Sequence, residues 1–148
     1  MHKKSVMWLL VAALLFGVVL VGGSPHPTVY AAEADSQTPL FKDVTPQEAY
    51  ELIKKNKDNP KFVILDVRTP REFAGGHIEG AVNLDYNAPT FKNELNDLDK
   101  TKMYLVYCRT SRRSRGAFNM MKALEFREVY HMLGGIVRWT SEGLPTKK

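Results

Sequence analysis

The sequence predicts an α/β domain with a mainly parallel central sheet of about five strands, flanked by helices. From residue 40 onward, short apolar runs alternate with segments of helical periodicity. This alternation is typical of a parallel sheet covered on both faces. In addition, the runs at 61–67 and 102–108 are apolar over most of their length, as expected of strands buried on both sides.

Each element has its own signal in the sequence. We expect strands at 40–44, 61–67, 81–85, 102–108 and 128–133. We expect helices at 45–56, 69–76, 90–98, 111–124 and 136–143. The first of these helices carries three start signals: Thr45 as N-cap, Pro46 at the first helical position and Glu48 to complete a capping box.

The N-terminus has the pattern of an export signal. Lys3 and Lys4 form a short basic start, and residues 6–23 carry no charge. We interpret residues 1–31 as a signal peptide or an uncleaved membrane anchor, because both fit this pattern. Either one places the domain outside the cytoplasm, as a secreted, periplasmic or externally anchored protein. The polar residues 32–39 are a predicted linker to a domain at 40–148.

Charge and cysteine content limit the classes of function. Loss of Lys3 and Lys4 with the leader lowers the formal charge from +5 to +3, which is too mild to indicate nucleic-acid binding. The single cysteine cannot form an intramolecular disulfide, and an unpaired thiol in an exported protein suggests a reactive group or an intermolecular partner. Without a second cysteine or a histidine cluster, the sequence gives no support for a metal site, and it indicates no cofactor.

Cys108 ends an apolar run and is followed by four arginines within seven positions. A strand that ends at Tyr107 and a helix that begins near 111–114 would place the thiol beside a helix N-terminus. Unpaired amide groups and the helix dipole favour an anion there, and they shift a thiol toward the reactive thiolate. The other interpretation is that Cys108 is a small buried hydrophobic residue.

Four ordered motifs resemble those of single-domain rhodaneses, the rhodanese-like sulfurtransferases. They are VTPQEAYELI, FVILDVRTPREFAGGHIEGAVNLD, VYCRTSRRS and LGGIVRWTSEGLP. The resemblance covers about residues 41–145 and implies a three-layer rhodanese-like fold. It also implies that the cysteine attacks a sulfur donor such as thiosulfate and becomes a persulfide. A thiophilic acceptor, which can be cyanide, a small thiol or a protein thiol, then takes the sulfur.

The resemblance also implies roles for individual residues. Cys108 is the nucleophile and persulfide carrier. The loop that cradles the persulfide consists of Arg109, Thr110, Ser111, Arg112, Arg113 and Ser114. Arg113 matches the loop arginine of the family and is expected to pair with Asp66, which leaves Arg109 to contact the anionic donor. Ser111 stands where many members have glycine, so a positive φ there would strain it.

Other polar residues near the motifs receive supporting or structural roles. Asp66 and Arg68 follow a predicted strand and are expected to support the site as an ion pair. Glu72 is interpreted as a solvated charge, His77 as a turn residue and His131 as a structural residue of its strand.

Two alternative functions remain open. The first is a persulfide carrier that receives sulfur from a partner and does not itself turn over a free donor. The second is a phosphatase or arsenate reductase of the same fold. Those enzymes have a loop one residue longer, with arginine six positions after the cysteine, whereas Ser114 occupies that position here. The shorter loop favours sulfur over a bulkier phosphoryl group.

Overall fold

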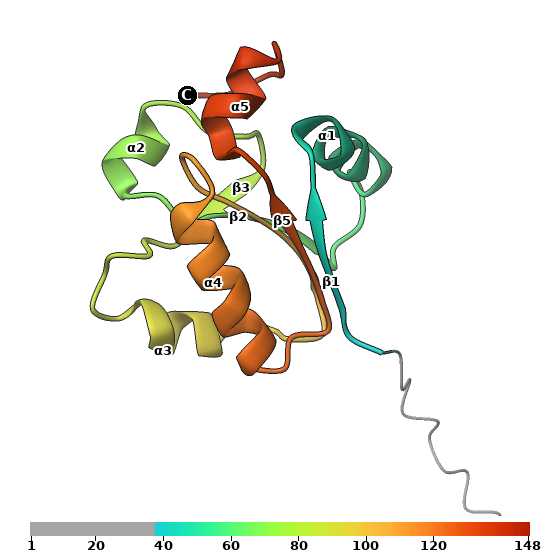
Figure 1. Ribbon diagram of the computed structural model, residues 1–148, viewed down its shortest axis with the longest axis vertical. Helices are drawn as coiled ribbons and strands as arrows, with labels where there is room; N and C mark the ends of the chain where they lie inside the picture. Colours follow the sequence, from blue (N-terminus) through green and yellow to red (C-terminus); the bar gives the residue numbers. More distant parts are fainter. Residues whose placement is uncertain (1–37) are drawn as a thin grey trace, which may run out of the picture. The chain divides into compact units, whose positions relative to one another are not determined.

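The computed structural model describes residues 38–148, which form a five-stranded sheet with helices on both faces (Figure 1). All strands run parallel, in the spatial order β1-β5-β4-β2-β3. The strands are β1 (Leu40–Val44), β2 (Phe62–Asp66), β3 (Ala81–Asn83), β4 (Met103–Tyr107) and β5 (Glu128–Met132). The helices are α1 (Pro46–Lys55), α2 (Pro70–Ala74), α3 (Phe91–Asn96), α4 (Arg112–Ala123) and α5 (Gly135–Ser141). The predicted fold class is confirmed.

The central strand β4 contributes to two hydrophobic cores, one on each face of the sheet. Tyr104 and Val106 belong to the core that α3 and α4 cover. Leu105 and Tyr107 belong to the core that α1 and α5 cover. Because side chains alternate between the faces of a strand, a strand buried on both faces needs apolar residues at successive positions. This requirement accounts for the unbroken run MYLVY in β4.

Two helices begin with capping boxes. In α1, the Thr45 hydroxyl accepts from the Glu48 amide, and the Glu48 carboxylate accepts from the Thr45 amide. In α2, Thr69 and Glu72 repeat the arrangement. Each box satisfies two amide groups that the first turn of a helix leaves without partners. The second box also fixes Glu72 at the start of α2, from where it contacts the candidate site.

The polar segments that follow β2 and β4 lie together at the carboxyl edge of the sheet. Asp66 and Tyr107 are partners in the register of β2 and β4, so the residues that follow them lie at the same edge. The adjacent strand β5 leads through Gly134 into α5, whose N-terminus reaches this edge as well. Ligands of parallel sheets bind outside the carboxyl ends of the strands, so the candidate site belongs here.

The predicted leader at 1–31 lies outside the described residues, as does most of the predicted linker at 32–39. In the part of the chain that the structure describes, no helix is both long enough and apolar enough to cross a membrane.

Candidate active site

The loop that follows β4 surrounds the Cys108 thiol with hydrogen-bond donors. Cys108 is only 1% exposed, and the Ser114 hydroxyl lies 3.4 Å from its Sγ. Burial raises the pKa of the Cys108 thiol, but hydrogen bonds from the Ser114 hydroxyl and from the amides of Ser114, Thr110 and Arg113 outweigh it, so the pKa falls below its usual value. The loop therefore favours the thiolate, which is the nucleophilic form of cysteine.

Two amides at the N-terminus of α5 anchor the same loop by donating hydrogen bonds to carbonyl groups of the loop. The amide of Ile136 donates to the Cys108 carbonyl at 2.9 Å, and the amide of Val137 donates to the Arg109 carbonyl at 3.2 Å. Gly135 lies so close that a Cβ at its position would be 2.4 Å from the Cys108 carbonyl oxygen. Only glycine fits this contact without a shift of the backbone, so Gly135 sets how closely α5 approaches the loop.

Ser111 has the positive φ that the sequence analysis named as a source of strain. Its φ is 83°, in the left-handed region that favours glycine. Its hydroxyl accepts from the Gly134 amide at 2.6 Å and donates to the Met132 carbonyl at 3.4 Å. A glycine could not form these bonds. The serine therefore offsets part of its conformational cost by tying the loop to the end of β5.

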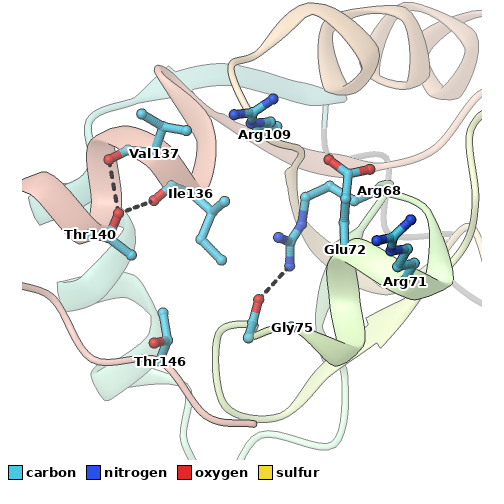
Figure 2. A pocket seen from close by; sticks show the side chains of 10 residues that line it. Arg68, Arg71, Glu72, Gly75, Arg109, Ile136, Val137, Thr140 and Thr146 are labelled. Carbon is cyan, nitrogen blue, oxygen red and sulfur yellow. Dashed lines mark hydrogen bonds between the residues drawn. The ribbon is translucent and has the colours of Figure 1, made fainter.

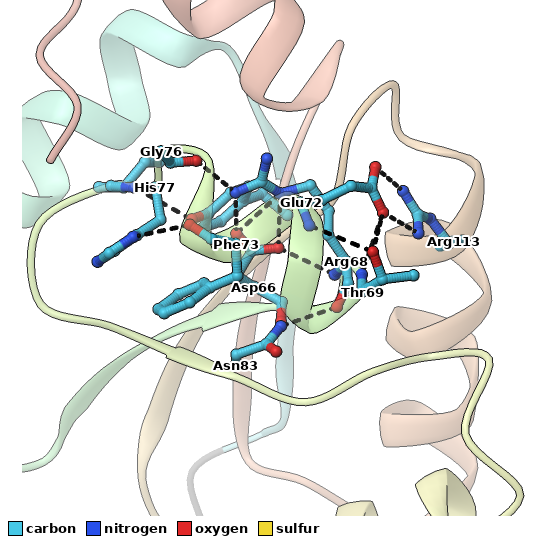
Figure 3. Close-up of polar contacts among 11 residues, drawn as sticks. Asp66, Arg68, Thr69, Glu72, Phe73, Gly76, His77, Asn83 and Arg113 are labelled. Atoms are coloured by element: carbon cyan, nitrogen blue, oxygen red, sulfur yellow. Dashed lines mark hydrogen bonds and ion pairs between the residues drawn. The ribbon is translucent and has the colours of Figure 1, made fainter. Parts of the chain in front are cut away.

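Arg113 binds Glu72, and the expected pairing of Arg113 with Asp66 is wrong. The Arg113 guanidinium donates two hydrogen bonds to the Glu72 carboxylate, each 2.7 Å long (Figure 3). Glu72 is therefore not a solvated charge. The Arg113 side chain is the largest cause that lowers the pKa of Glu72 to about 2. This bidentate pair joins the first turn of α4 to α2. It stabilises the loop through Glu72, where Asp66 was expected.

Asp66 is unavailable to Arg113 because it is buried and already bound to Arg68. The Arg68 guanidinium lies 2.6 Å from the Asp66 carboxylate, and both side chains are buried. Arg68 also donates to the Gly76 carbonyl at 2.7 Å, and the Asn83 side-chain amide donates to the carbonyls of Asp66 and Arg68 (Figure 3). Because these bonds are all made to protein groups, the Asp66–Arg68 pair stabilises the wall of the site.

A cavity of about 310 Å³ opens beside the loop. Figure 2 shows Arg68, Arg71 and Glu72 on one side of it, Ile136, Val137 and Thr140 on the other, and Arg109 between the two sides. The guanidinium groups of Arg71 and Arg109 make no hydrogen bond or ion pair with residues 38–148. Unpaired guanidinium groups are suited to a small anion. Cys108 is not part of this wall, and the loop reaches the cavity through Arg109.

The polar groups around the thiol are suited to anions and not to metal ions. Among residues 38–148, no group of three or more His, Cys, Asp and Glu side chains is arranged to hold a metal. The groups that face Cys108 are amides and a hydroxyl, and the cavity beside it adds the guanidinium groups of Arg68, Arg71 and Arg109 next to the paired Glu72 carboxylate. Amides, hydroxyls and guanidinium groups donate hydrogen bonds to anions.

Comparison with known proteins relates this geometry to a family. The Rhodanese-like domain family matches residues 45–142. The chain belongs to this family. Thiosulfate sulfurtransferase GlpE of Pseudomonas putida is 34% identical to this rhodanese-like chain over 99 residues, which are 67% of the chain and 84% of GlpE.

Two further comparisons give the extent of the likeness. A Synechocystis protein is 30% identical over 98 residues, which are 65% of this chain but 52% of the relative, so the chain spans about half of that relative's length. The rhodanese-related protein of Thermoplasma volcanium matches the structure with a TM-score of 0.62 at 27% identity, over 72% of this chain and 97% of that protein.

Sequence reasoning missed the surroundings of His131 in this rhodanese-like domain. The imidazole is buried, with Nε2 at 3.0 Å from the Ser114 hydroxyl and Nδ1 at 2.9 Å from the Asp43 carboxylate. Asp43 and His131 are 88 residues apart, and no spacing in the sequence connects them. They meet because β1 pairs with β5 in a register that sets Asp43 opposite His131.

The conformation of Ser111 yields a prediction on stability. Ser111→Ala should lower the free energy of unfolding by about 1 kcal/mol more than Ser111→Gly, because alanine keeps the unfavourable φ that glycine relieves. Both variants lose the bonds to Gly134 and Met132, so their difference isolates the backbone strain. Urea denaturation of the two variants beside the wild type measures it. Equal losses would show that the positive φ at this position carries no strain.

The Arg113–Glu72 pair predicts a pH dependence of stability. Because the pKa of Glu72 falls from 4.5 to about 2, its stabilising effect is complete above about pH 4.5 and is lost as the pH falls through about 2. We expect the free energy of unfolding of the wild type to fall more steeply over this range than that of Glu72→Gln, which has no carboxylate to protonate.

Chemical denaturation at a series of pH values measures these slopes. The matched control is Glu51→Gln, because Glu51 meets only Lys54 in an exposed pair; this variant should keep the wild-type slope. Parallel curves for the wild type and Glu72→Gln would contradict the prediction.

Proposed function

We propose that this chain is an exported sulfurtransferase that moves sulfane sulfur through a persulfide on Cys108. One observation carries the proposal: Cys108 lies at the carboxyl end of the central strand, inside a loop whose donors lower the pKa of its thiol. The family relation supports it, because GlpE of Pseudomonas putida is a thiosulfate sulfurtransferase. Export rests on the predicted leader at residues 1–31.

In the first half-reaction, the Cys108 thiolate attacks the outer sulfur of an anionic donor such as thiosulfate. A new sulfur–sulfur bond forms at Sγ, the sulfur–sulfur bond of thiosulfate breaks, and sulfite leaves with its electron pair. Arg109 and Arg71 at the adjacent cavity are suited to hold the anionic part of the donor before this step. The product is a cysteine persulfide.

In the second half-reaction, an acceptor attacks the outer sulfur of the persulfide. Cyanide leaves as thiocyanate, or a thiolate leaves as a new persulfide, and the Cys108 thiolate is restored. The amides of Thr110, Arg113 and Ser114, together with the Ser114 hydroxyl, stabilise this leaving thiolate as they stabilise the resting one. The chain has one cysteine, so the sulfur acceptor must be a separate molecule: cyanide, a small thiol or the thiol of another protein.

The test of this function is thiocyanate formation from thiosulfate and cyanide. We expect steady turnover by the wild type and no turnover above background by Cys108→Ser, whose folding is checked by its denaturation curve. Turnover that survives in Cys108→Ser would contradict the proposal. A persulfide that forms on Cys108 without turnover of free thiosulfate would instead favour a sulfur carrier that depends on a protein partner.

The same assay tests the role of Arg109. Arg109→Gln should raise the KM for thiosulfate by about tenfold, since it removes one charge-assisted contact with the donor. Arg127→Gln is the matched control, because Arg127 lies immediately before β5 at the opposite edge of the sheet. An equal change in both variants would show a general effect of charge and would contradict a donor site at the cavity.

A further inference from the structure

A chain of short polar contacts links the Cys108 thiol to Asp43, on the outer strand of the sheet. The Ser114 hydroxyl lies 3.4 Å from Cys108 Sγ and 3.0 Å from His131 Nε2. On the far side of the imidazole, His131 Nδ1 lies 2.9 Å from the Asp43 carboxylate. The residues come from the loop after β4, the first turn of α4, β5 and β1. None of the steps proposed above for sulfur transfer uses Asp43 or His131.

The surroundings of His131 fix which ring nitrogen carries a proton when the imidazole is neutral. The Arg115 side chain, 2.7 Å from the other oxygen of the Asp43 carboxylate, is the largest cause that lowers the pKa of Asp43. Asp43 is therefore an ionised acceptor that requires a proton on Nδ1. The Nε2 atom is then left with a lone pair that faces Ser114.

Counting protons on the Ser114 hydroxyl shows which charge states fit. A hydroxyl has one proton to donate, and three groups lie within reach of it: Cys108 Sγ, His131 Nε2 and the Ser111 carbonyl, the last at 3.1 Å. A thiol with a neutral imidazole fits, because the thiol donates to Ser114 and Ser114 donates to Nε2. A thiolate with an imidazolium fits as well, because Nε2 then donates to Ser114 and Ser114 donates to the thiolate. A thiolate with a neutral imidazole is less favourable, since Sγ and Nε2 then compete for the one hydroxyl proton and one of them loses this bond; the thiolate keeps only its backbone amides.

We propose that His131 accepts the Cys108 proton through the Ser114 hydroxyl, and that Asp43 holds His131 in the tautomer that this transfer needs. The sulfur–hydrogen bond breaks as the proton joins Ser114 Oγ, and the original Ser114 proton moves to Nε2. The products are a thiolate and an imidazolium, the total charge is unchanged, and nothing is oxidised. His131 acts through Ser114 and is therefore a positioning residue. The inference rests on the proposed function, for which the thiolate is the attacking group.

The charged groups around His131 act in opposite directions. Burial lowers the pKa of His131 and so does Arg115 on α4, whereas Asp43 on β1 and the Ser111 carbonyl of the loop raise it; the pKa falls below its usual value. The neutral imidazole, which a lowered pKa favours, is the form that can accept a proton from the Cys108 thiol. A thiolate at Cys108 adds a negative charge on the Ser114 side, and this charge should raise the pKa of His131.

The test is an NMR titration of His131 in the purified full chain, without any sulfur donor. The pKa of His131 should be about one unit higher in the wild type than in Cys108→Ser, a tenfold change in proton affinity, because only the wild type forms a thiolate. In a Ser114→Ala background, the same Cys108→Ser change should shift the pKa of His131 by less than half as much. The resonance of His77, which stacks on Phe73 and has no contact with this chain of groups, is the internal control and should not differ between the four proteins.

The nitrogen shifts of His131 in the unmodified protein give a second measurement that does not depend on any variant folding. They should show a proton on Nδ1 and none on Nε2 while the ring is neutral. A proton on Nε2 in the neutral ring would overturn the proposal. So would equal pKa values of His131 in the wild type and Cys108→Ser, or a shift that persists in full without Ser114.

These outcomes are separable from the proposed function. If a persulfide forms on Cys108 but the pKa of His131 does not depend on Cys108, only the proton transfer is rejected. A coupled His131 in a protein that transfers no sulfur would reject the sulfurtransferase function and leave the proton transfer intact.

Discussion

The hydrogen bond from the Ile136 amide to the Cys108 carbonyl fixes the position on which the chemistry of the site depends. It forms only because Gly135 lets α5 approach the loop more closely than any side chain would allow. Ser111 makes a second attachment, to the turn at Gly134. With the loop held at both points, its amides surround Sγ and offset the desolvation of the buried thiol. Preorganised donors of this kind favour an anion without reorganisation during the reaction.

The arginines near this loop differ in their binding partners, which the sequence does not show. Arg68 is buried against Asp66, and Arg113 is locked to Glu72 in a bidentate pair. Arg109 alone extends from the loop to the cavity without a partner among residues 38–148. A guanidinium group that is already paired binds an anion poorly, because it would have to give up its carboxylate first. This difference makes Arg109 the arginine of the loop that is suited to a donor, beside Arg71 on the cavity wall.

The order of the elements and the position of Cys108 could be predicted from the sequence because both depend on local signals. The capping box at Thr45 and the apolar run that ends at Cys108 each lie within a few residues. The partners of the loop could not be predicted. Arg113 and Glu72 are 41 residues apart on different helices, and either carboxylate, Asp66 or Glu72, satisfied the charge pattern. Only the burial of Asp66 against Arg68 decides between them.

The most direct measurement is the intact mass of the purified protein after exposure to thiosulfate and removal of the excess donor. We predict a gain of a single sulfur atom in the wild type, its absence in Cys108→Ser, and its loss when cyanide is added. An unchanged mass in the wild type, or a sulfur that is also gained by Cys108→Ser, would contradict a persulfide on Cys108.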